Sequence, residues 1–318
     1  MGISNEELLR KAVLDTAAFG GAGEAPLTVE QVEEFLRVAI KPQAMLPVVR
    51  TVFSNAQTWQ ESKLIFGSRV MRPGTEGVRN VSGDRVAPTT GNIEIQTSLI
   101  RGEVPVTDEV FEDQVERAGF ADTLRAMIAE QVGLDVEEVM VNGDTGSGDT
   151  YLALFNGWFE VADDASDNVQ IDVSGDGQDY QLIFNKLVVN LPDEFKRDVP
   201  NTKMFAPLRL IEKYRDILAS RGTALGDFAL EGERKVVYQG YEVIGVPILT
   251  ITAGSPDTAE ILFTHRLNCY AGFQRMLKFE QFRDPREGNV SFVITARVNA
   301  QIAHTPATVL AQLVDVEP

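Results

Sequence analysis

The sequence has few of the residues that most often carry chemistry, with one cysteine and two histidines among 318 residues. Cys269 has no intrachain disulfide partner, which is typical of a protein made in a reducing cytoplasm. No apolar run approaches the roughly 20 residues that a membrane-spanning helix needs. The N-terminal segment MGISNEELLRKAV carries charges where a signal peptide has its apolar segment. We therefore expect neither a secreted disulfide scaffold nor a membrane protein.

Basic residues are also scarce, because 29 Lys and Arg stand against 47 Asp and Glu, a net charge of −18. A protein that holds DNA by its phosphates needs clustered Lys and Arg, whereas this chain repels polyanions on average. The charge therefore argues against sequence-specific DNA binding. It has an equally simple explanation in solubility, since a net charge far from zero keeps proteins apart.

Motifs for catalysis or metal binding are missing as well. The acidic loop DVSGDGQD (172–179) begins like an EF-hand, but its twelfth position is Ile183 where a bidentate Glu is needed, which favours a solvated loop. His265 and His304 are isolated in strand-like segments, and we expect both to be structural. Cys269 lies in the apolar run LNCYAGF and is expected to be a small buried side chain. We predict no catalytic residue, no metal ligand and no cofactor, and hence a protein that is not an enzyme.

Residues 1–20 and 28–40 show helix-capping signals at both ends. The β-rich segments SKLIFGSRVMR and NIEIQTSLIRGEV follow, and in the second Ile93, Ile95, Thr97 and Leu99 alternate at period two. The Gly-rich stretch between these segments is typical of a loop tip. The pattern predicts a long two-stranded hairpin, which is marginally stable alone and needs a partner surface.

Residues 107–141 predict a long helix with a break near Gly119. Its acidic first turns suit the helix dipole. A helix is also predicted around 180–191, before Pro192, with its apolar face at Tyr180, Ile183, Phe184, Leu187 and Val188. Another is predicted around 207–222, from Pro207 to a Gly222 cap, with its face at Leu210, Tyr214 and Ile217. The sequence ends in strands that flank the turn DPREGN. Two sets of residues mark the expected buried faces: Leu124, Ile128, Val132, Val136 and Val139 on the long helix, and Phe292, Ile294, Ala296, Val298, Ala300 and Ile302 on the last long strand.

Four segments, taken in order, resemble the Hong Kong 97-like major capsid proteins of tailed bacteriophages. They are IEIQTSLIRGEVPVTDEVFED, AEQVGLDVEEVMVNGDT, KMFAPLRLIEKYRDILASRG with VVYQGYEVIGVPIL, and FRDPREGNVSFVITARVNAQIAHTPATVLA. The resemblance covers nearly the whole chain and rests on order and spacing more than on any one segment. It implies an α+β fold with four parts. These are an N-terminal arm (1–58), an E-loop (59–101), a P-domain with its spine helix (102–142 and 276–302), and an A-domain (143–275 and 303–318).

The resemblance also implies a function. The chain would be a subunit that self-assembles, through hexamers and pentamers, into the icosahedral head shell enclosing phage dsDNA without sequence-specific binding. It would be assembled in the cytoplasm of the host bacterium and reside in the virion capsid. A separate scaffolding protein and a portal are expected partners, and a decoration protein is a further candidate. The alternatives are an encapsulin-type nanocompartment shell protein, a cytosolic α/β enzyme of unknown chemistry, and a phage tail or decoration protein.

Some members of that family cross-link an E-loop Lys to a P-domain Asn. Here the E-loop offers only Lys63, near its base, and its outer part carries arginines, whose guanidinium stays protonated and is a poor nucleophile. We expect no such cross-link. In that family the E-loop of one subunit lies over the P-domain of its neighbour, so the resemblance implies that the charge of +3 on residues 63–85 faces the charge of −8 on residues 107–142. An equally simple alternative is that both are solvated surfaces whose exposed ion pairs contribute little. The expected inter-subunit contacts are Arg69, Arg72, Arg79, Arg85, Asp108, Glu109, Glu112, Asp113 and Glu116.

Overall fold

The structure is a computed structural model that describes residues 43–65, 69–71, 73, 76–77, 87–107, 120–174, 179–220, 235–252, 257–284 and 286–316. The chain divides into two compact units. The larger comprises residues 43–104, 133–282 and 292–318, and the smaller comprises residues 1–42, 105–132 and 283–291. The two N-terminal helices and the break near Gly119 that the sequence predicts lie outside the described residues.

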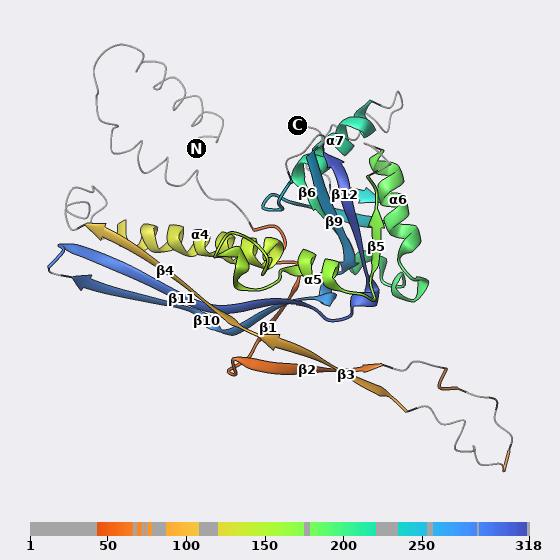
Figure 1. Cartoon of the computed structure of the whole chain (residues 1–318), viewed down its shortest axis with the longest axis horizontal. Helices are drawn as coiled ribbons and strands as arrows, with labels where there is room; N and C mark the ends of the chain where they lie inside the picture. The colour runs from red at the N-terminus through yellow and green to blue at the C-terminus, as the bar shows by residue number, and fades with distance from the viewer. Residues whose placement is uncertain are drawn as a thin grey trace, which may run out of the picture. The chain divides into compact units, whose positions relative to one another are not determined.

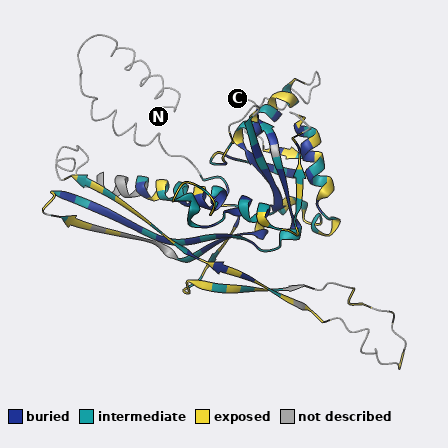
Figure 2. Cartoon of the chain, in the orientation of Figure 1, coloured by how far each residue is buried: buried dark blue, intermediate teal, exposed yellow. Residues whose placement is uncertain are grey.

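A six-stranded mixed sheet forms the core of the larger unit (Figure 1). Its central strands β12, β9 and β6 are antiparallel neighbours, whereas β5 pairs with β12 and β8 with β6 in parallel. Figure 2 shows these central strands as largely buried. In spatial order the strands are β5 (Val169–Asp172), β12 (Thr308–Val316), β9 (Asp257–His265), β6 (Thr202–Pro207), β8 (Tyr241–Val246) and β7 (Val236–Tyr238).

Two amphipathic helices pack on one face of this sheet: α6 (Tyr180–Asn190) and α7 (Leu208–Ala219). Asp179 caps α6 by accepting a hydrogen bond from the Leu182 N–H at 3.1 Å. The helices touch where the rings of Phe184 and Tyr214 meet edge to face, with their centroids 5.1 Å apart. The predicted α6 face is confirmed. On α7 the prediction was wrong at Ile217, which is exposed while Ile211 is buried, because the sheet lies under positions 210, 211 and 214.

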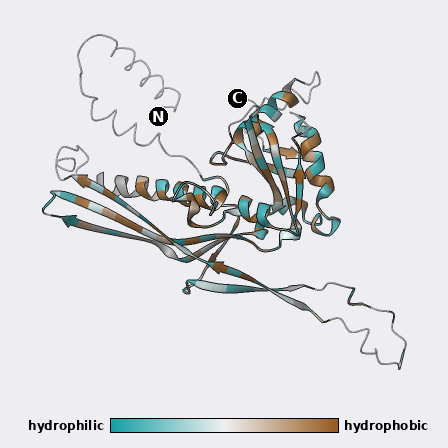
Figure 3. Ribbon diagram, viewed as in Figure 1, coloured by the Kyte–Doolittle hydropathy of each residue, from teal (hydrophilic) through white to brown (hydrophobic). Residues whose placement is uncertain are grey.

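The second sheet has four strands in the order β1 (Arg50–Phe53), β10 (Cys269–Asp284), β11 (Asn289–Ile302) and β4 (Ser98–Thr107). The predicted alternation on β11 is confirmed, since all six of its expected inward residues are buried. The hydropathy colouring of Figure 3 shows where apolar residues occur along these strands. Between β9 and β10, Arg266–Asn268 form a 3-10 turn, and the chain changes sheets there.

Strands β2 (Thr58–Ile65) and β3 (Thr89–Gln96) form the predicted antiparallel hairpin, with Trp59 opposite Ile95 and Lys63 opposite Gly91. The predicted return strand does not continue past Thr97. Residues 98–107 are the separate strand β4, which joins the four-stranded sheet, so the alternating burial stops at Thr97 and Leu99 is exposed.

Helix α4 (Phe120–Asn142) supplies the described part of the predicted long helix. Ile128, Val136 and Val139 of its expected apolar face are buried, and Val132 is partly buried. Residue 107, the expected first residue, ends strand β4 instead. Within the described residues, no helix is long and apolar enough to cross a membrane.

In the smaller unit, the predicted turn between the last two long strands is confirmed. The Gly288 N–H donates to the Asp284 carbonyl at 3.0 Å, and the Arg286 N–H donates to Asp284 Oδ1 at 2.9 Å. Gly288 has a φ of +62°, a conformation that L side chains rarely adopt. The glycine in EGN therefore allows β10 to turn back into β11.

Candidate inter-subunit site

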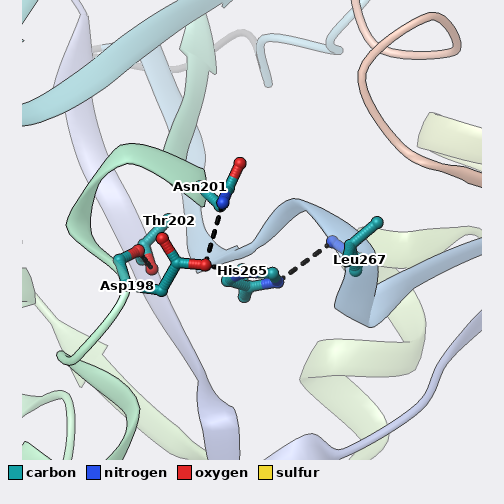
Figure 4. Close-up of polar contacts among 5 residues, drawn as sticks. All are labelled: Asp198, Asn201, Thr202, His265 and Leu267. Carbon is teal, nitrogen blue, oxygen red and sulfur yellow. Dashed lines mark hydrogen bonds and ion pairs between the residues drawn. The ribbon is translucent and has the colours of Figure 1, made fainter.

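His265 is held in a network of short-range polar contacts at the end of β9 (Figure 4). Its Nδ1 accepts a hydrogen bond from the Leu267 N–H at 3.2 Å. Nε2 therefore carries the proton of the neutral ring, and it lies 3.2 Å from Asp198 Oδ2. Both ring nitrogens are occupied by contacts that fix a turn, which supports the expected structural role.

Asp198 joins this ring to the turn before β6. The Asn201 side-chain amide donates to its carboxylate at 2.8 Å, and the Thr202 hydroxyl donates to its backbone carbonyl at 2.8 Å. The hydrogen bond from Asn201 and the one from His265 hold the pKa of Asp198 below its usual range. The carboxylate is thus a fixed acceptor for the turn.

The other reactive side chains are also engaged in structure. Cys269 is fully buried, and burial raises the pKa of its thiol to about 12, so the thiolate that would react is suppressed. Burial, followed by the charge of Lys63, lowers the pKa of His304, so this ring is neutral at pH 7. Its ring meets Phe195 edge to face at 5.3 Å. Within the described residues, no three His, Cys, Asp or Glu side chains gather closely enough to hold a metal ion.

The base of the β2–β3 hairpin docks on the body of the larger unit. Ile93 and Ile95 are buried together with Tyr270 of β10, and Trp59 packs against the same cluster. The hairpin reaches β10 at Gly272, where an added Cβ would lie 2.7 Å from Ile95 Cγ2 and 3.3 Å from Trp59 Cη2. The lack of a side chain at Gly272 is therefore what allows the close approach.

A buried carboxylate holds the chain just before β1. Glu137 of α4 is 1% exposed and accepts hydrogen bonds from the backbone N–H groups of Ala44 (3.1 Å), Met45 and Leu46 (3.0 Å). The charge count of −8 for residues 107–142 includes Glu137, but its carboxylate is buried, so the expectation that it faces a neighbouring subunit was wrong. Its spacing was the sequence signal that could have indicated burial, because Glu137 precedes the buried Met140 and Val141 by three and four positions and so lies on the same helix face.

The C-terminal end of the same helix holds a second loop. The Asn142 side-chain amide donates to the Ile248 carbonyl at 2.7 Å, and its Oδ1 accepts from the Thr250 N–H at 3.1 Å. Within the larger unit, α4 therefore fixes two segments that lie 91 to 108 positions away in sequence. Such long-range polar contacts have no periodic signature, so the sequence did not predict them.

The structure tests little of the predicted charge contact. Arg69 is described and exposed, whereas the other eight expected contact residues, Arg72, Arg79, Arg85, Asp108, Glu109, Glu112, Asp113 and Glu116, lie outside the described residues.

The described part of the chain shows a different group of acids around α5 (Trp158–Asp164). Burial, reinforced by Asp163 and Glu160, raises the pKa of Glu260 on β9 to about 7.

No family model matches the chain. A search of curated proteins finds a relative in Bacillus subtilis (strain 168), the putative prophage capsid protein YqbE. It is 29% identical over 308 residues, which cover 93% of this chain and 94% of the relative. The similarity thus extends over nearly the full length of both proteins.

Solved structures show the same fold at lower sequence identity. The capsid of an empty GTA particle matches with a TM-score of 0.61 at 13% identity, over 95% of this chain and 98% of that one. The procapsid of satellite phage P4 with its size determination (Sid) protein matches with a TM-score of 0.63 at 12% identity, over 98% of each chain. The holo-SrpI encapsulin complex from Synechococcus elongatus PCC 7942 matches with a TM-score of 0.59 at 10% identity, over 100% of this chain and 98% of that one.

These matches define the class of protein: the chain has the Hong Kong 97-like fold, with α+β architecture. The resemblance to phage major capsid proteins that the sequence predicted is confirmed, because the curated relative is a prophage capsid protein.

Proposed function

We propose that this chain is the major capsid protein of a tailed bacteriophage or prophage, a structural subunit and not an enzyme. The observation that carries the proposal is the full-length similarity to a prophage capsid protein, joined to a fold that matches phage capsids from end to end. In this role the subunit self-assembles into an icosahedral shell around dsDNA, through hexamers and pentamers, in the cytoplasm of the host. Its location is then the virion capsid.

A separate scaffolding protein and a portal are the partners that a phage head of this kind requires, and a decoration protein is a further candidate. The P4 procapsid includes a size determination protein, which supports the view that a capsid subunit of this fold can work with an assembly factor. We propose the four parts as first inferred: the N-terminal arm (1–58), the E-loop (59–101), the P-domain (102–142 and 276–302) and the A-domain (143–275 and 303–318).

Expression of the chain alone and with candidate scaffolding proteins tests this function. Electron microscopy of the purified material is expected to show closed shells, or ring-shaped capsomers that become shells when scaffold is supplied. A stable monomer under every condition would contradict the proposal.

An encapsulin-type shell is the second candidate, because the SrpI encapsulin matches the whole chain at a TM-score of 0.59. The sequence relationship favours the phage reading, since the curated relative comes from a prophage. Shells that package a co-expressed cargo enzyme, with no portal vertex, would favour the encapsulin.

We also propose that opposite charges guide the subunits into register. The E-loop arginines Arg69, Arg72, Arg79 and Arg85 would lie over Asp108, Glu109, Glu112, Asp113 and Glu116 of the neighbouring subunit. The support is the charge count of +3 in residues 63–85 against −8 in residues 107–142. Attraction of this kind acts mainly on encounter rate and is screened by salt over about 10 Å at 0.1 M.

The double variant Arg72→Glu with Arg79→Glu tests the charge contact. We expect its shells to form more slowly than those of the wild type, with a smaller difference as salt is raised. Light scattering measures the rate, and circular dichroism checks that the subunit stays folded. Equal rates at low salt would show that the two charge groups do not meet.

A further inference from the structure

The E-loop hairpin is held to the body of its own subunit in two ways: by an extended base, which includes Ala303 and an Asn299 side-chain amide that donates to the Gln96 carbonyl at 2.7 Å, and by a single side chain further out. The first is the apolar base, where Ile93, Ile95 and Trp59 pack on Tyr270 and Gly272. The second is Lys63, four residues further along β2, whose Nζ donates a hydrogen bond to the Ala303 carbonyl at 2.8 Å. Residues 63 and 303 are 240 positions apart, so this bond joins the hairpin to the segment after β11.

The path of the Lys63 side chain depends on its cross-strand neighbour. Lys63 lies opposite Gly91 in the hairpin register. A Cβ at position 91 would be 2.8 Å from Lys63 Cε and 3.1 Å from Lys63 Cγ. The Lys63 stem therefore lies flat over Gly91, where any other residue would lift it off the strand. Gly91 creates the groove that carries the ammonium group inward to Ala303.

The acceptor end of this contact is rigid. The Ala303 N–H donates to the Asn268 backbone carbonyl at 2.8 Å. The neighbouring His304 N–H donates to Asn268 Oδ1 at 2.8 Å, and the Asn268 side-chain amide returns a hydrogen bond to the His304 carbonyl at 2.9 Å. Asn268 is 7% exposed, so these bonds are protected from water. Lys63 thus bonds to a carbonyl whose position is fixed on both sides.

The surroundings also tolerate a cation. Burial and Lys63 itself lower the pKa of His304, so at neutral pH the ring adds no second positive charge. Asp167 and Glu194 act on the pKa of the same ring in the opposite direction. The Lys63 ammonium therefore meets the Ala303 carbonyl beside an imidazole that adds no positive charge.

We propose that Lys63 is a latch that fixes the angle of the E-loop hairpin on the free subunit. Without Lys63 the hairpin is held only at its base, by the apolar cluster and the Asn299–Gln96 hydrogen bond, and we expect it to pivot there. A second attachment four residues further out removes that freedom. The strands β2 and β3 then leave the body at Lys63 and Gly91 in one fixed direction, already in the free subunit. In the assembly role, which rests on the proposed function, a subunit with a preset hairpin loses less conformational freedom when it joins a shell.

The variant Lys63→Met tests the latch, because it keeps the long apolar stem and removes the donor. Nitroxide labels at Thr90→Cys on the hairpin and Glu212→Cys on α7 report the hairpin angle through their distance distribution. Native Cys269 is fully buried and does not interfere. Ser62→Ala, an exposed change on the opposite face of the same strand, is the matched control. We expect the distribution to broaden at least twofold in Lys63→Met and to be unchanged in Ser62→Ala.

Trp59 provides a second readout that separates a pivot from unfolding. In a Trp158→Phe background it is the single tryptophan, and its emission reports whether the base stays docked. We expect that emission to be the same with and without Lys63→Met. An unchanged distance distribution would overturn the proposal. A red shift of Trp59 would also overturn it, since Lys63 would then support the whole hairpin and not only its angle.

Assembly gives the last readout. At equal subunit concentration we expect Lys63→Met to yield several-fold fewer regular shells than Ser62→Ala. If the wild type itself forms no shells, the proposed function fails while the distance measurement on the free subunit still decides the latch. If Lys63→Met broadens the distribution but assembles as well as the control, the latch does not act in assembly and that part of the proposal is wrong.

Discussion

The six-stranded sheet and the β2–β3 hairpin are both β structure of this chain, but they are stabilised in different ways. The sheet buries its central strands under α6 and α7, and residues such as Phe263 and Val309 are 0% exposed. The hairpin buries only the inner face of its base. Its outer face is a polar row in which Asn92 contacts Gln60 and Ser62. A two-stranded ribbon cannot cover itself, so it is fixed only where another part of the chain lies beneath it.

The largest difference between the two regions should appear when a core side chain is removed. Phe263 lies inside the sheet cluster and meets the ring of Tyr241 edge to face at 5.1 Å. Phe263→Ala leaves a cavity and is expected to lower the free energy of unfolding by about 4 kcal/mol. Ser62→Ala on the hairpin should change it by less than about 0.5 kcal/mol. Urea denaturation measures both, and similar values would refute the contrast.

Glu137 tests how much a buried polar contact contributes to the free energy of unfolding. Glu137→Ala removes the acceptor of three backbone N–H groups and leaves buried donors unsatisfied, so we expect a loss of about 3 kcal/mol. Glu137→Gln keeps one acceptor oxygen and should cost less. Glu138 is the next residue and is exposed, so Glu138→Ala serves as the control. A Glu137→Ala subunit as stable as this control would show that the buried carboxylate is dispensable.

Glycine substitutions compare the base of the hairpin with an open strand. Gly272→Ala places a methyl group 2.7 Å from Ile95, and we expect about 2 kcal/mol of destabilisation together with a change in Trp59 emission. An alanine at Gly102 on β4 would meet nothing within 4 Å, and Gly102→Ala should have little effect on either measurement. Equal effects at the two sites would mean that the hairpin does not rest on Gly272.

The smallest expected effect is a pH dependence of stability that comes from Glu260 on β9 of the six-stranded sheet. The pKa of Glu260 is raised to about 7 in the folded chain, above its ordinary value of 4.5, so the folded state binds this proton more tightly than the unfolded state. Stability should therefore fall as pH rises from about 4.5 to 7, by about 1 kcal/mol after allowance for partial exposure. Glu260→Gln should flatten that slope, whereas Glu212→Gln, at an exposed position of α7, should not. The same slope in both variants would exclude Glu260 as its source.

The sequence alone determined the features that repeat along the chain. Alternation at period two located β11 and the hairpin, and the spacing of Tyr180, Ile183, Phe184 and Leu187 located α6, because a strand or helix with one buried face must repeat its apolar residues at a fixed interval. The order of the segments was also enough to predict the Hong Kong 97-like fold, since that order is set by the chain itself.

Tertiary structure alone decided which distant segments meet. The sequence does not indicate that Glu137 holds residues 44–46, that Asn268 holds residues 303 and 304, or that Lys63 reaches Ala303. It also did not show that the strand after Thr97 leaves the hairpin for another sheet. A single carboxylate, amide or ammonium bonds to whatever the fold brings within about 3 Å. Such contacts depend on three-dimensional position and leave no periodic pattern in the sequence.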